Sequence, residues 1–235
     1  VTVLRIEPVI AGALITGSKL YDAATDPLMG VISDRTRSRW GRRRPWLLVG
    51  GIASGLSFAA LFAIPTGLSP LPLYVAVGAA LLLLATAYTV FNVPYLAMPA
   101  EMTDDYHERS VMMSYRVVLI AIGTTVGLAG APALLAFTQE RLGWSAPAAY
   151  RGLGVVLGVG ITVSMVAAFF GTRRARATER TATTLPARER WRLLLGNRPF
   201  LLYLGIKLTS LFSLASITAT QLFFVTYVLQ KSVGL

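Results

Sequence analysis

The sequence predicts an all-α polytopic membrane protein, and three observations support this fold class. Of the 235 residues, 54% are hydrophobic and only 14% are charged, whereas soluble domains carry about 25% charged residues. Six apolar runs reach the roughly 20 residues that a membrane-spanning helix needs; they cover residues 8–32, 46–64, 73–98, 111–137, 151–171 and 200–229. These runs lack the period-two alternation, and exceed the length of about 10 residues, that are typical of transmembrane barrel strands.

The loops between the runs differ in charge, which predicts the orientation of the chain. The second loop (65–72) carries no charge, and the fourth (138–150) carries only Glu140 and Arg141. The first and fifth loops are instead rich in arginine, and cytoplasmic loops are enriched in Lys and Arg. Loops one, three and five are therefore predicted to be cytoplasmic, because the acidic residues of loop three (99–110) contribute little to orientation. We expect a multi-pass protein of the cell (inner) membrane, with the lipid bilayer as its surroundings.

The formal net charge of +11 comes largely from two of these loops. The arginines of the first loop are Arg35, Arg37, Arg39, Arg42, Arg43 and Arg44, and those of the fifth are Arg173, Arg174, Arg176, Arg180, Arg188, Arg190, Arg192 and Arg198. Because juxtamembrane arginines produce this balance, no nucleic-acid partner is needed to explain it. The absence of cysteine excludes disulfides, thiolate zinc sites and thiol catalysis.

The first apolar run contains three charged residues, which are costly in a membrane. Lys19, Asp22 and Asp26 are spaced i, i+3 and i+7, so they share one face of a helix. Each costs about 2.5–3.5 kcal/mol at the centre of a spanning helix unless it is paired or solvated. Repulsion between the two carboxylates is relieved by a proton, by the Lys19 ammonium or by a bound cation, as a coupled transporter requires. The alternative is an internal ion pair that only locks helices together.

Further polar residues and prolines interrupt the apolar runs. Pro27 is expected to loosen the first helix and to free carbonyl oxygens beside the carboxylates, which suits a hard cation such as sodium. Pro94 is expected to interrupt the third. Arg116 could pair with a carboxylate or bind a polar substrate, or it could extend to the membrane edge. Glycine pairs at four-residue spacing predict close helix packing: Gly51 with Gly55, Gly123 with Gly127, and Gly154 with Gly158.

The motifs around these residues resemble a known family. They are YDAATDPLMG at residues 21–30, RWGRRRPW at 39–46 and YTVFNVPY at 88–95, followed by ER at 108–109 and SYR at 114–116. They are similar to the glycoside–pentoside–hexuronide:cation symporters of the major facilitator superfamily, the melibiose-permease-like group. The resemblance covers the whole chain and implies part of that fold: about six transmembrane helices, matching family helices 2 to 7.

The resemblance implies roles for individual residues. Asp22, Asp26, Thr89 and Asn92 match the cation site, with Asp22 and Asp26 as the sodium ligands if the coupling ion is not a proton. Asn92 replaces an aspartate of the best-known sodium-coupled members, which favours protons without deciding the matter. The implied substrate-binding residues are Lys19, Tyr88 and Arg116. The implied cytoplasmic gate consists of Asp34, Arg35, Arg39, Arg42 and Arg43.

The implied function is cation-coupled transport of a sugar or related small solute by alternating access. No cofactor beyond the coupling ion, and no obligate protein partner, is expected. We expect residues 1–171 to form an N-terminal bundle lacking its first helix, 172–199 an inter-bundle loop, and 200–235 the first helix of a second bundle. Because Val1 is not Met and Leu235 directly follows an apolar run, we expect a fragment that does not transport alone.

Three alternatives remain open from the sequence. A carrier of the same clan could move a lysolipid or another amphiphile. An intramembrane prenyltransferase would use two aspartate motifs to hold magnesium and a diphosphate, with Asp104 and Glu108 as the weak second motif. The chain could also be a non-transporting remnant of a carrier. We expect a transporter rather than an enzyme.

Overall fold

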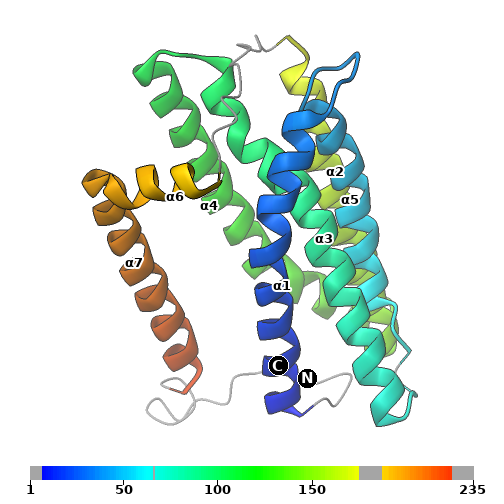
Figure 1. Cartoon of the computed structure of the whole chain (residues 1–235). Coiled ribbons are helices and arrows are strands. Elements are labelled where there is room, and N and C mark those ends of the chain that lie inside the picture. The colour runs from blue at the N-terminus through cyan, green and yellow to red at the C-terminus, as the bar shows by residue number, and fades with distance from the viewer. Residues whose placement is uncertain (1–6, 66, 175–186, 224–235) are drawn as a thin grey trace. The chain divides into compact units, whose positions relative to one another are not determined.

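In the computed structural model, residues 7–65, 67–174 and 187–223 are described, and they are helical throughout apart from short connections (Figure 1). The chain divides into two compact units, Val1–Arg180 and Thr181–Leu235. The boundary lies within the arginine-rich segment 172–199.

The first unit contains five long helices, which correspond to the first five apolar runs. They are α1 (Pro8–Arg35), α2 (Arg44–Phe62), α3 (Pro70–Met102), α4 (Tyr106–Ala136) and α5 (Ala146–Gly171). A π-helical turn, η1 (Phe137–Arg141), continues α4, and a 3₁₀ turn, η2 (Thr172–Arg174), continues α5. Asp105 caps the start of α4, because its carboxylate accepts hydrogen bonds from the backbone N–H groups of His107 and Glu108.

Four helices of the described chain are both long and apolar enough to cross a membrane: α2, α3, α4 with η1, and α5. At about 1.5 Å per residue, the 28 residues of α1 also exceed a hydrocarbon core of about 30 Å. Its charged residues make α1 less apolar than the others. The architecture is therefore that of an all-α, multi-pass membrane protein.

Two prolines of the sequence motifs, Pro27 and Pro94, lie within long helices, and neither of them ends its helix. Pro27 lies inside α1, and Pro94 lies inside an α3 that is continuous from Pro70 to Met102. The expectation that Pro94 interrupts this helix is thus wrong. A spanning helix tolerates proline in its interior, and Pro94 is fully buried in the packing of α3.

α2 lies at the centre of the packing and contacts both α5 and α3, while α1 packs against α3 (Figure 1). The approach of α2 to α5 depends on glycine. A methyl group at Gly55 would overlap the Thr162 hydroxyl and the Gly158 carbonyl, and one at Gly158 would lie 2.7 Å from the Gly55 carbonyl. Two of the three predicted glycine pairs therefore form this contact.

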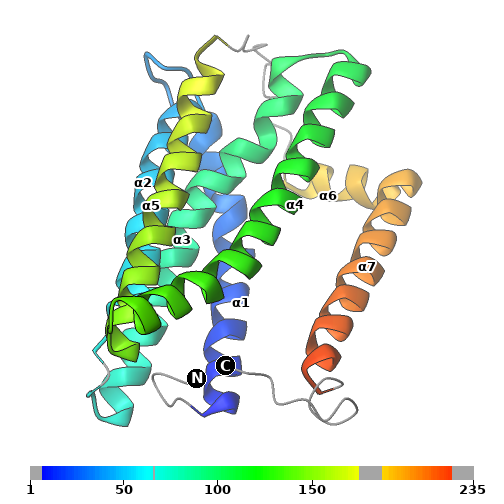
Figure 2. The same ribbon diagram turned by 180° about the vertical axis from the view of Figure 1, so that it is seen from behind.

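α4 differs from its neighbours because none of its residues is buried. It stands apart from α2 over most of its length (Figure 2). At Gly123 and Gly127, the third predicted pair, a methyl group would have no atom of another residue within 4 Å. Close helix packing at this pair is absent from the described chain.

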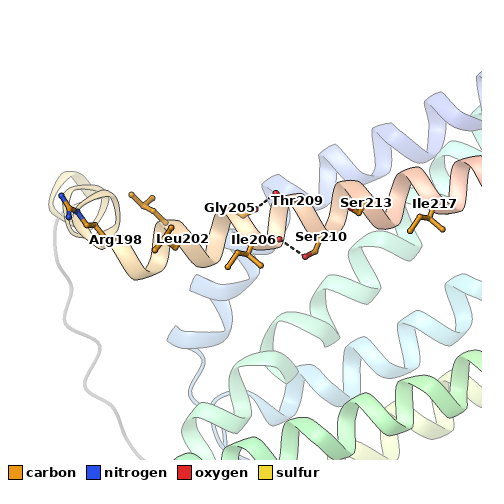
Figure 3. Close-up of a pocket in the computed structure, with 9 residues that line it drawn as sticks. Arg198, Leu202, Gly205, Ile206, Thr209, Ser210, Ser213 and Ile217 are labelled. Carbon is orange, nitrogen blue, oxygen red and sulfur yellow. Dashed lines mark hydrogen bonds between the residues drawn. The ribbon is translucent and has the colours of Figure 1, made fainter.

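The second unit contains a short helix, α6 (Ala187–Gly196), and a long one, α7 (Arg198–Phe223). α6 falls inside the predicted inter-bundle loop, 172–199. Figure 3 shows one open face of α7, on which Gly205 and Ile206 accept hydrogen bonds from Thr209 and Ser210 one turn later. The predicted run to residue 229 extends beyond the described residues.

Candidate functional site

The charged face of α1 carries an ion pair between two of its own residues. Lys19 Nζ lies 2.9 Å from Asp22 Oδ2. The side chain of Asp22 is 17% exposed and that of Lys19 is 70% exposed. The second carboxylate oxygen of Asp22, Oδ1, is buried and has no hydrogen-bond partner. This oxygen keeps free acceptor capacity, which a proton or a cation can use.

Asp26, one turn further along α1, is tied to α3. The Thr89 hydroxyl donates a 2.7 Å hydrogen bond to Asp26 Oδ1, and Thr89 is only 4% exposed. A second contact between the same helices joins the Tyr21 and Thr86 hydroxyls at 3.0 Å. Because Thr86 and Thr89 are three residues apart, they lie on one face of α3 and fix the register of α1 against it.

The other predicted site residues of α3 lie close by in sequence. Asn92 is half-buried one turn beyond Thr89, on the same face, whereas Tyr88 is 47% exposed. In the described chain Asn92 forms no hydrogen bond with Asp22 or Asp26. This face of α3 thus provides a hydroxyl that binds Asp26 and, one turn further along, an amide. Hydroxyl, amide and carboxylate oxygens are all ligands suited to a hard cation.

Arg116 does not meet the carboxylates. Its guanidinium lies over the ring of Tyr95, 5.8 Å from the centroid. Among residues 7–174, with residue 66 outside the description, Arg116 forms no ion pair with Asp22 or Asp26. The possible pairing with a carboxylate is therefore not found, and Arg116 keeps its donors for another ligand.

A network of charges joins the arginine loop to the ends of α1 and α3. Arg43 lies 2.7 Å from both Asp34 Oδ1 and Glu101 Oε1, and Arg42 donates a hydrogen bond to the same Glu101 oxygen. Three of the five predicted gate residues are thus brought together, namely Asp34, Arg42 and Arg43. Arg35 and Arg39 form no ion pair with any described acid, and Arg39 stacks on Trp40 instead.

Glu101 is the member of this network that the sequence reasoning missed. It lies at the end of α3, in the third loop as predicted from hydropathy. The predicted topology places that loop and the arginine loop on the same side of the membrane. An acid next to an arginine-rich loop on one side of the membrane is the signal that could have identified Glu101 as the partner.

The next arginine of the loop joins α2 to α5. Arg44 Nη2 donates a 2.9 Å hydrogen bond to the Phe169 carbonyl, and its guanidinium lies 4.6 Å from the centroid of the Phe169 ring. Trp40 packs edge-on against the same ring. This contact secures the end of α5 and leaves Arg42 and Arg43 to the charge network.

The acidic side chains of the described residues do not gather into a multi-ligand metal centre. In the described part of the chain, no three His, Cys, Asp or Glu side chains converge as metal ligands. Glu108, from the weak second acidic motif, accepts a 2.6 Å hydrogen bond from Thr103 where α3 ends and α4 begins. The paired aspartates, with a lysine and a threonine as neighbours, form a site of low charge.

The chain is similar in sequence to several proteins that are named as symporters. The glycoside/cation symporter YagG of Escherichia coli (strain K12), named as putative, is 33% identical over 224 residues, covering 94% of this chain and 47% of that protein. The inner membrane symporter YicJ of the same organism is 31% identical over 175 residues, covering 74% and 37%. The sodium-dependent lysophosphatidylcholine symporter 1-A of Danio rerio is 31% identical over 128 residues, covering 54% and 24%.

The chain spans less than half the length of these curated relatives. All three are named as symporters, in agreement with the expectation of a transporter rather than an enzyme. A sequence model of the family described as MFS/sugar transport protein matches residues 1–234. With its paired aspartates, its arginine loop and its membrane-spanning helices, the chain belongs to the MFS/sugar transport protein family.

Proposed function

We propose that this chain is part of a cation-coupled symporter of the inner membrane, which carries a sugar or related small solute by alternating access. The observation that carries the proposal is the buried, unpartnered Oδ1 of Asp22, one turn from an Asp26 that Thr89 orients. The coupling ion is a proton or sodium. Asp22, Asp26, Thr89 and Asn92 bind it, and Lys19, Tyr88 and Arg116 face the solute.

The coupling of solute movement to the ion follows from the negative charge of the two aspartates. An isolated carboxylate in a spanning helix is costly, and a second one adjacent to it raises the cost when both are ionised. A cation or proton that enters with the solute removes this penalty. The loaded site therefore crosses between its two orientations more readily than the ionised, empty one, and solute movement follows the ion gradient.

The charge network at the ends of α1 and α3 supports the closing of the carrier on one side. Glu101 holds Arg42 and Arg43, and Arg43 also holds Asp34. Partly buried charge-assisted hydrogen bonds contribute about 1.5–3 kcal/mol each. The network fixes the position of the arginine loop, which can then help to close the cytoplasmic side in the outward-facing state.

The proposal is tested with the full-length protein in membrane vesicles. We expect Asp22→Asn and Asp26→Asn each to abolish cation-driven accumulation of a radiolabelled solute identified from a panel of glycosides and sugars. Glu140→Gln is the matched control, because it neutralises an exposed acid far from the aspartates in sequence. Unchanged accumulation ratios in both aspartate variants would overturn the assignment of the cation site.

A lysolipid is the second candidate solute, favoured by the similarity to the lysophosphatidylcholine symporter. The same vesicles are supplied with lysophosphatidylcholine in place of sugars. Cation-dependent uptake of the lysolipid, with no uptake from the sugar panel, would replace the first solute class by the second and leave the cation site unchanged.

A further inference from the structure

The ion pair between Lys19 and Asp22 does not hold the fold together. Both residues belong to α1 and are three positions apart, so the pair ties no helix to another. Lys19 is 70% exposed and approaches an Asp22 that is only 17% exposed. The ammonium therefore reaches Oδ2 of the carboxylate from the exposed side of the helix.

Among the described residues of the first unit, no second basic side chain lies beside these aspartates. Within residues 7–65 and 67–174, Lys19 is the only basic side chain within ion-pair distance of Asp22 or Asp26. α3, which packs against α1, carries one charged residue, Glu101, and this acid is held by Arg42 and Arg43. Tyr88 is the titratable side chain of α3 nearest in sequence to Thr89. The charge of Lys19 is thus balanced by Asp22.

We propose that Lys19 is a tethered cation that competes with the coupling ion for Asp22 and so lowers the affinity of the site. This inference rests on the proposed function. Lys19 occupies Oδ2 and leaves Oδ1 available, so an entering ion binds beside a fixed positive charge. Transport requires binding that is favourable enough for entry yet weak enough for release, and the ammonium supplies that weakening.

The size of the effect follows from Coulomb's law. A unit charge about 5 Å away changes the affinity for a monovalent cation about fourfold at the dielectric constant of water, and more than a hundredfold at an effective value of about 20. Replacing Lys19 by glutamine removes the charge. We expect the half-saturating cation concentration to fall by at least about fourfold.

The experiment uses the purified full-length carrier without solute. Sodium binding is measured by calorimetric titration, and protonation of the aspartates by infrared difference spectroscopy of their carboxyl bands during a pH titration. Lys19→Gln is expected to bind sodium more tightly, or to protonate at higher pH if the site takes protons alone. Lys19→Arg keeps the charge and should match the wild type.

Lys207→Gln is the matched control, because it removes a lysine from α7 that lies over Tyr203 rather than beside an acid. Lys19→Met, which keeps the aliphatic stem, replaces Lys19→Gln if that variant fails to fold. Suppose that the charge-removing Lys19 variants leave the sodium affinity and the carboxyl titration unchanged, while Asp22→Asn alters both. That result would overturn the inference about Lys19 and leave the proposed cation site standing. If Asp22→Asn and Asp26→Asn also change nothing, the proposed cation site fails as well.

Discussion

The hydroxyl of Thr89 donates a 2.7 Å hydrogen bond to Asp26 Oδ1 and so joins α3 to α1 across 63 positions of sequence. This bond does two things at once. It fixes the position of one carboxylate of the proposed cation site, and it holds α1 and α3 in register.

The first prediction concerns Thr89. Thr89→Val keeps the shape of the side chain but removes the hydroxyl that donates to Asp26 Oδ1. We expect cation-driven accumulation to need a higher cation concentration, by about fivefold or more. Thr89→Ser restores the hydroxyl and should restore the affinity. Equal cation dependence in the valine and serine variants would contradict a role for this bond.

The second prediction concerns Glu101. Glu101→Gln removes the shared partner of Arg42 and Arg43, so the arginine loop loses charge-assisted hydrogen bonds. We expect the cytoplasmic side to open more often. A single cysteine at Thr25, in a full-length protein otherwise free of cysteine, reports this opening through labelling by an impermeant maleimide in inverted vesicles. The labelling rate should rise about fivefold, and Glu140→Gln should leave it unchanged.

The third prediction concerns the contact of α2 with α5. Gly55→Ala introduces a methyl group where Thr162 and the Gly158 carbonyl already lie, and such overpacking costs about 1–3 kcal/mol. Gly123→Ala is the control, because nothing lies within 4 Å of its added methyl group. Thermal unfolding in detergent should occur at lower temperature for Gly55→Ala than for Gly123→Ala. Identical unfolding temperatures would show that the close approach is dispensable.

The fourth prediction concerns Arg44. Lysine cannot combine the planar stacking on Phe169 with the hydrogen bond to its carbonyl. We expect Arg44→Lys to lower the unfolding temperature in detergent. Arg37→Lys, an exchange at an exposed position of the same loop, should leave it unchanged. The prediction fails if the two variants unfold together.

Hydropathy predicted the long helices because burial in lipid acts on every residue of a span. It did not predict their ends: α3 continues to Met102, past the predicted end of the apolar run at residue 98. Backbone hydrogen bonding extends a helix beyond the membrane, where hydropathy no longer reports on it. The effect of Pro94 on α3 was misjudged for a related reason. The side chains that pack around Pro94 come from elsewhere in the fold and cannot be identified from a single sequence.

The candidate site was likewise predicted in part from the sequence. The i, i+3, i+7 spacing predicted the shared face of Lys19, Asp22 and Asp26, since one helix fixes their geometry. Family resemblance assigned Asp26 and Thr89 to one cation site but did not predict the hydrogen bond between them. The pairing of Glu101 with Arg43 was not foreseen. Both join helices distant in sequence, and neither spacing nor composition determines which side chains meet across such an interface.

The ion pair on α1 also has an electrical consequence. Lys19 and Asp22 move together because they share a helix, so the two aspartates and the lysine carry a formal charge of −1 in either orientation of the carrier. A potential of 100 mV acts on one such charge with about 2.3 kcal/mol. A single bound monovalent cation makes the site neutral, so we expect the membrane voltage to act mainly on the return of the empty carrier. Pre-steady-state currents that persist without the coupling ion would report this movement.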